Sequence, residues 1–218
     1  YGNCTDALYY QNPNGNYSYV AGAPYPIQIN RLTSFPIHWK IDTSARKTTA
    51  VFDAAFDIWF NRSMPMNSNK VHPEDVNQND GVELMIWINN QGYVKGGTAK
   101  GGIIQPAGRL IKSNVSIYGV SGKWDVWATK DMPLFNIDNP GLGWDVVSFV
   151  KLDPVDEFNA DAKWLIDYAA TYLTCSDGKR CFTSKVDDVI GTMWVTSAQA
   201  GFETWANSEN LKSISFSA

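Results

Sequence analysis

Apolar and polar residues alternate strictly along several stretches of this chain, and the clearest runs from Gly81 to Asn89. One side of this stretch is aliphatic and the other is mixed: Val82, Leu84, Ile86 and Ile88 against Glu83, Met85, Trp87 and Asn89. A period of two predicts a β-strand with one face in an apolar core. The other face then displays a carboxylate, a thioether, an indole and an amide in a row. Such a face fits a sugar cleft or, equally, an ordinary mixed solvent face.

A second alternating stretch, 197–205, repeats the same combination far away in the sequence. Ala198, Ala200 and Phe202 share one side, which leaves Gln199, Glu203 and Trp205 on the other. Two predicted strands therefore each present a glutamate and a tryptophan. Glycosidases use such a pair of carboxyl groups, one as nucleophile and the other as general acid/base.

A third stretch, Thr49 to Phe60, places four large apolar residues and two alanines on the face opposite Asp57: Ala50, Phe52, Ala54, Phe56, Ile58 and Phe60. Asp57 therefore belongs to the face predicted to carry the cleft. Carboxyl groups held close together push their pKa values apart, so that one stays ionised while another keeps its proton. The alternative is a solvated aspartate on a strand.

Weaker patterns complete the expected secondary structure. Further strands are predicted at 25–32, 37–41 and 145–150, a hairpin at 115–117 and 123–128, and a long surface loop over 1–24. Asp161 to Thr174 is the one convincing helix, because Trp164, Leu165, Tyr168, Ala169, Tyr172 and Leu173 recur at helical spacing and predict a core-facing stripe. In the hairpin, either Trp124 or Trp127 is expected in the core and the other could meet a ligand.

Size, composition and charge narrow the function. At 218 residues and 24.3 kDa, without repeats or a linker, the chain is predicted to form one domain over 1–218. A net charge of −4 and a pI near 5.1 argue against a nucleic-acid partner, and no apolar run is long enough to span a membrane. Nine Trp, ten Tyr and ten Phe exceed the needs of such a core, so some should line a binding surface. A neutral polymer is therefore the partner that this charge and this aromatic content fit best.

The sequence offers no convincing metal or cofactor motif. The spacing of His72, Glu74, Asp75 and Asp80 matches neither a zinc nor a calcium site, so we expect no metal and no cofactor. Cys175 and Cys181 flank a polar turn and could form a disulfide in an oxidising compartment, or remain free thiols.

Several of these segments resemble glycoside hydrolase family 12. The likeness is carried, in family order, by 55–59 (AFDIW), 82–87 (VELMIW), 105–108 (QPAG), 124–127 (WDVW), 145–149 (DVVSF) and 200–203 (AGFE). The resemblance implies an all-β jelly-roll sandwich of two curved antiparallel sheets with one packed helix, here at about 161–174. It also implies a secreted, monomeric, retaining endo-β-1,4-glucanase that acts on cellulose-like glucans.

Roles for individual residues follow from the same resemblance. Glu83 would be the nucleophile, Glu203 the acid/base, and Asp57 the residue that supports the nucleophile. Substrate contacts would come from seven others: Met85, Trp87, Asn89, Pro106, Trp127, Trp205 and Tyr1. Retention requires carboxyl groups about 5–5.5 Å apart, so we expect the two glutamate strands to lie close together.

The chain also departs from the family and leaves alternatives open. The family's N-terminal strands are not recognisable before Tyr1, and Cys4 lacks the cysteine with which its family counterpart pairs. The segments at 92–102 and 132–143 look like inserted loops at the cleft. The alternatives are a xyloglucan- or mixed-linkage β-glucan-specific hydrolase, a non-catalytic glycan-binding jelly roll, and a secreted interaction protein that does not rely on hydrolysis.

Overall fold

The computed structural model describes residues 27–61, 81–93, 95, 104–128, 145–172 and 193–218, and the backbone of three short strands before them. The short strands are β1 (Asn3–Cys4), β2 (Tyr9–Gln11) and β3 (Tyr17–Tyr19). They correct the prediction of an unbroken loop over 1–24. Tyr1, Cys175, Cys181 and the predicted loop 132–143 lie outside the described residues.

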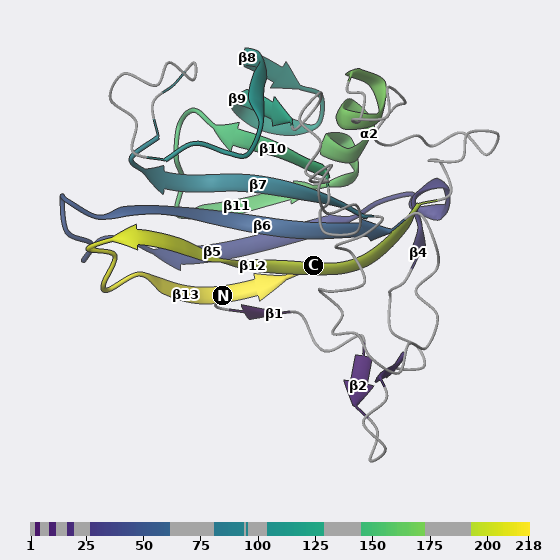
Figure 1. The fold of residues 1–218 in the computed structure, drawn as a ribbon, viewed down its shortest axis with the longest axis horizontal. Coiled ribbons are helices and arrows are strands. Elements are labelled where there is room, and N and C mark those ends of the chain that lie inside the picture. The colour runs from purple at the N-terminus through teal and green to yellow at the C-terminus, as the bar shows by residue number, and fades with distance from the viewer. Residues whose placement is uncertain are drawn as a thin grey trace, which may run out of the picture.

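The fold is mostly β, as predicted, and is built from a large sheet and a smaller one (Figure 1). The remaining elements are β4 (Ile27–Gln28), η1 (Ile29–Arg31), β5 (Pro36–Asp42), β6 (Val51–Asn61), β7 (Gly81–Gln91), β8 (Arg109–Ile117), β9 (Val120–Ala128), β10 (Asp145–Lys151), β11 (Glu157–Asp161), α2 (Lys163–Tyr172), β12 (Trp194–Ala206) and β13 (Lys212–Ser217). The large sheet has the order β1-β12-β6-β7-β10-β9-β8, with β4 also paired to β12. The small sheet has the order β11-β5-β13, and β2 and β3 pair separately.

One pair in the large sheet breaks the expected antiparallel pattern. β10 runs parallel to β7, with Val146 opposite Glu83, and antiparallel to β9. The two-sheet architecture is confirmed, whereas the expectation of wholly antiparallel sheets is wrong at this pair. A parallel neighbour requires a crossover rather than a hairpin, and alternation within a strand does not reveal it.

The main core lies between the two sheets, as the alternation of β6 requires. Phe52, Phe56 and Phe60 of β6 are fully buried there. The Phe56 ring meets Trp39 of β5 edge-on at 5.8 Å and lies 6.2 Å from Phe158 of β11. The opposite face of β6 carries the polar residues discussed below.

Helix α2 covers this core from the side of the hairpin β8–β9 (Figure 1). Leu165 and Ala169 are fully buried, as the helical periodicity predicts. Trp164 is an exception to the predicted core stripe, because it is 39% exposed and packs edge-on against Tyr118 at 4.7 Å. Gly119 makes room for its indole: a Cβ there would lie 2.4 Å from Trp164, and φ is +73°.

Another boundary was wrong at the start of the described chain. Within the described part of the predicted strand 25–32, Ile27 and Gln28 pair with β12, whereas residues 29–31 turn into a short 3₁₀-helix. Ile29 is buried in the core, and its N–H donates to the carbonyl of Met193 at 2.9 Å. The turn therefore ties the start of β12 to this segment.

Candidate active site

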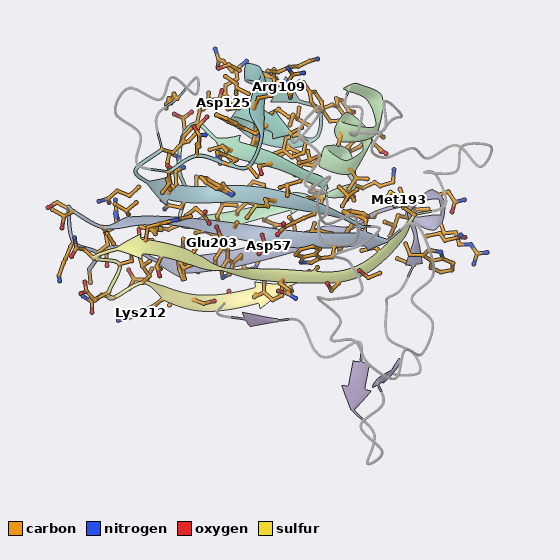
Figure 2. All side chains as sticks on the ribbon, viewed as in Figure 1. Asp57, Arg109, Asp125, Met193, Glu203 and Lys212 are labelled. Atoms are coloured by element: carbon orange, nitrogen blue, oxygen red, sulfur yellow. The ribbon has the colours of Figure 1, made fainter. Side chains whose placement is uncertain are left out.

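Three neighbouring strands of the large sheet carry the three predicted catalytic residues. β6 lies between β7 and β12, and it carries Asp57 on the face that points away from the main core. On one side Trp59 of β6 is opposite Glu83 of β7, and on the other Asp53 is opposite Glu203 of β12. Figure 2 shows Asp57 and Glu203 on these adjoining strands. The structure thus adds a fourth carboxyl group, Asp53, to the predicted three.

The two aspartates of this face are buried between the glutamates. Asp53 is 0% and Asp57 is 3% exposed, whereas Glu203 is only partly buried. Burial, followed by the negative charges of Glu83 and Glu203, raises the pKa of Asp57 well above its usual value. Burial, followed by the charges of Glu203 and Asp57, does the same to the pKa of Asp53. Both aspartates therefore favour the neutral acid, a form that can donate a hydrogen bond to an ionised glutamate.

The strand pairing does not place the two glutamates side by side. Trp59 and Asp53, their partners on β6, are six residues apart, which corresponds to about 20 Å along a strand. The two glutamate strands lie on either side of β6, so each pairs with β6 rather than with the other. Asp57 lies between the two levels, and its pKa responds to both glutamates. It is the residue that links them electrostatically.

An apolar and aromatic cluster continues this face next to the carboxyl groups. Met85 and Trp87 of β7 and Trp127 of β9 belong to it, and they are 6%, 2% and 3% exposed. Trp124 instead lies in the main core, so Trp127 is the tryptophan of the hairpin that faces away from that core. Because Trp87 and Trp127 are almost completely covered, neither presents a free ring to a ligand in this structure.

Tyr93 packs against this cluster and is partly exposed, as is Leu110, and sequence reasoning missed it. Its ring lies edge-on to Trp87 at 6.2 Å and to Trp127 at 6.3 Å. Its hydroxyl donates to Asp125 Oδ2 at 2.6 Å and accepts from Trp127 Nε1 at 3.0 Å. The sequence signal was Asp125 itself, a charged residue that shares the face of Trp127 and lies between two residues of the main core, Trp124 and Val126.

The other predicted substrate-binding residues are distributed differently. Asn89 lies opposite Ala54, a core-facing residue, because a β-bulge in β7 shifts the register between Trp87 and Asn89. The predicted face of Asn89 is therefore wrong, and its side chain donates to Asp156 Oδ1 at 2.6 Å. Pro106 is buried in the segment before β8. Trp205 is 50% exposed and sits at a bulge near the end of β12.

No cluster of three or more His, Cys, Asp or Glu that could hold a metal ion occurs among the residues that the structure describes. Within the same residues, no helix is long and apolar enough to cross a membrane.

The fold and this face define a β-sandwich whose larger sheet carries acidic and aromatic residues side by side, an arrangement suited to carbohydrate. The family model of glycosyl hydrolase family 12 matches residues 8–218, so the chain belongs to that family.

Individual relatives agree with this placement. The probable cellulase Cel12b of Mycobacterium tuberculosis (strain ATCC 25618 / H37Rv) is 26% identical over 197 residues, which are 90% of this chain and 97% of the relative. Endoglucanase S of Pectobacterium parmentieri is 28% identical over 152 residues, 70% of this chain and 46% of that protein.

Solved structures support the fold. A family 12 xyloglucanase from Bacillus licheniformis in complex with ligand has a TM-score of 0.61 at 22% identity, over 91% of this chain and 67% of its own. A metagenome-derived family 12 endoglucanase has a TM-score of 0.61 at 20% identity, over 95% and 75% of the two chains.

Proposed function

We propose that this protein is a retaining endo-β-1,4-glucanase in which Glu83 attacks the anomeric carbon and Glu203 is the general acid/base. Glu203 would protonate the leaving oxygen and then deprotonate the incoming water. The observation that carries the proposal is the position of Asp57, a buried acid whose pKa responds to both glutamates on one face of the sheet. Membership of family 12 supports the same assignment.

Asp57 has a definite role in this mechanism. With a raised pKa it holds a proton, so it can donate a hydrogen bond to the Glu83 carboxylate without adding a second negative charge. If Asp57 were ionised instead, its negative charge would oppose ionisation of the nucleophile Glu83. No metal or cofactor is called for in this scheme, because both carboxyl groups carry out the chemistry.

The substrate is proposed to be a neutral β-glucan, handled outside the cell. Cellulase and endoglucanase names among the relatives favour cellulose-like glucans, and the xyloglucanase of similar fold makes xyloglucan the second candidate. A secreted location and a monomeric state remain predictions from the family resemblance.

The decisive experiment compares release of reducing ends from carboxymethylcellulose, mixed-linkage β-glucan and xyloglucan by the parent, Glu83→Gln and Glu203→Gln. We expect the parent to cleave at least one polymer, and both variants to lose activity by orders of magnitude. Glu157→Gln is the matched control, because Glu157 pairs with Lys40 on the small sheet, away from the site. A parent that binds glucan without cleaving it would identify a glycan-binding protein instead.

Product stereochemistry tests the retaining part separately. Retention requires the carboxyl groups of Glu83 and Glu203 to approach to about 5–5.5 Å in the substrate complex, closer than their strand positions alone would bring them. Proton NMR of the first product should show the β-anomer. An initial α-anomer would mean inversion and would replace the covalent step by direct attack of water.

A further inference from the structure

A network of hydrogen bonds surrounds Asp125, which lies on the same face of the large sheet as Glu83 and outside the proposed catalytic trio. Its side chain is 0% exposed, and both carboxyl oxygens are engaged. Oδ1 accepts from the Ser113 hydroxyl at 2.6 Å and from the Asn114 N–H at 3.0 Å, while Oδ2 accepts from Tyr93 at 2.6 Å. Asn114 has a φ of +57°, so the β8 backbone is turned out of regular strand geometry where it meets this carboxylate.

These bonds fix the orientation of one aromatic ring. The Tyr93 hydroxyl donates to Asp125 and accepts from Trp127, so its proton is committed within the protein. Burial, followed by the hydrogen bond to Asp125, raises the pKa of Tyr93, which keeps that proton in place at any working pH. The exposed part of Tyr93 therefore offers its ring, rather than its hydroxyl, to a ligand.

The position and the exposure of the Tyr93 ring make it available to a sugar. Trp87 and Trp127 are almost fully buried within the cluster, whereas Tyr93 is half-buried and packs against both. The cluster shares its face and strand with Glu83, since Met85 and Trp87 follow it at alternate positions on β7. Pyranose rings bind through their C–H faces to aromatic rings that are held rigid beforehand.

We propose that Tyr93 is a sugar-binding platform for one glucose unit of a β-glucan, and that Asp125 is the positioning residue that holds it. The proposal rests on the proposed glucanase function and adds a binding position to it. Tyr93 then takes the stacking role for which the sequence alone suggested Trp87 and Trp127.

Binding of cellohexaose and of soluble mixed-linkage β-glucan, measured by calorimetry and affinity electrophoresis, tests the platform. All variants carry Glu83→Gln, so that cleavage does not consume the ligand. Tyr93→Leu keeps an apolar side chain but removes the flat ring, and the dissociation constant should rise about three- to tenfold. Tyr93→Phe and Asp125→Asn should weaken binding less, because the ring stays and only its orientation loosens.

The control is Tyr118→Leu, since Tyr118 is 79% exposed but packs on Trp164 of α2. It should bind glucan as the parent does. Cooperative unfolding of each variant identifies those that retain the fold. A folded Tyr93→Leu variant with unchanged glucan affinity would overturn the platform while leaving the glucanase intact. Absence of binding and cleavage by every form, the parent without Glu83→Gln included, would instead overturn the proposed function.

In variants that retain Glu83, measuring KM and kcat separately distinguishes a role of Tyr93 in substrate binding from a role in supporting the fold. A platform residue lost from a subsite should raise KM for long oligosaccharides and leave kcat for folded protein within about twofold. A fall in kcat with unchanged KM would contradict the assignment.

Discussion

Replacing the buried Asp53 by Asn should change how the stability of this protein depends on pH. Asp53 is 0% exposed and faces Glu203 across the β6–β12 pair. Burial, followed by the charges of Glu203 and Asp57, raises its pKa well above the ordinary 3.8. A carboxyl group of this kind binds its proton more tightly in the folded than in the unfolded protein. Its contribution to stability is complete below pH 3.8 and is lost as the pH rises toward the folded-state pKa.

The magnitude follows from proton linkage. Within that window each pH unit costs the parent between about 1 and 2 kcal/mol from this one group. Asp53→Asn cannot ionise and avoids the loss. The free energy of unfolding of the variant minus that of the parent should therefore climb as the pH is raised above 3.8 toward the folded-state pKa of Asp53.

Urea unfolding followed by tryptophan fluorescence, repeated across this pH range, measures the difference directly. Asp42→Asn is the control, because Asp42 is only partly buried at the end of β5 and hydrogen bonds from Ser44 lower its pKa. Its difference curve should show no rise with pH. A flat curve for Asp53→Asn as well would refute the reasoning, since it would mean that Asp53 titrates alike in the folded and unfolded protein.

Two further substitutions test the core and the bulge of β7. Phe56→Ala should lower the free energy of unfolding by about 3–5 kcal/mol, because its ring is completely buried between the two sheets; a loss below about 1 kcal/mol in urea unfolding would contradict this packing. Asn89→Ala should cost about 1–2 kcal/mol through the lost bond to Asp156, yet leave glucan hydrolysis within about twofold of the parent. A drop in kcat of tenfold or more would return Asn89 to the cleft face.

Alternation predicted the strands that cross the middle of the large sheet because their two faces meet different surroundings. In β6 the phenylalanines enter the core while Asp57 remains on the other face. The local sequence of β6 is enough to predict this, without knowledge of its partner strands. The same rule failed at Asn89, where a bulge inserts one residue and reverses the face on which the later residues of β7 lie. Bulges depend on the partner strand, which the local sequence does not identify.

Strands β11 and β13 escaped prediction for a related reason. Glu157–Asp161 contains one buried apolar side chain, Phe158, and Lys212–Ser217 contains a bulge, so neither alternates cleanly. Both pair with β5, one on each side of it, although both come more than a hundred residues later in the chain. The register that sets Glu203 opposite Asp53 likewise depends on contacts between segments distant in the sequence, as does the placement of Tyr93 against Asp125.

The place of β6 between β7 and β12 has a consequence for how the protein is made. Strand β7 follows β6 closely in the chain, whereas β12 is synthesised more than a hundred residues later. Closing so long a loop is slow, and pairs of this kind tend to form late in folding. A nascent chain can therefore hold Asp57 and Glu83 together well before Glu203 reaches them. The proposed catalytic site would be completed only after β12 has been synthesised and has paired with the remaining edge of β6.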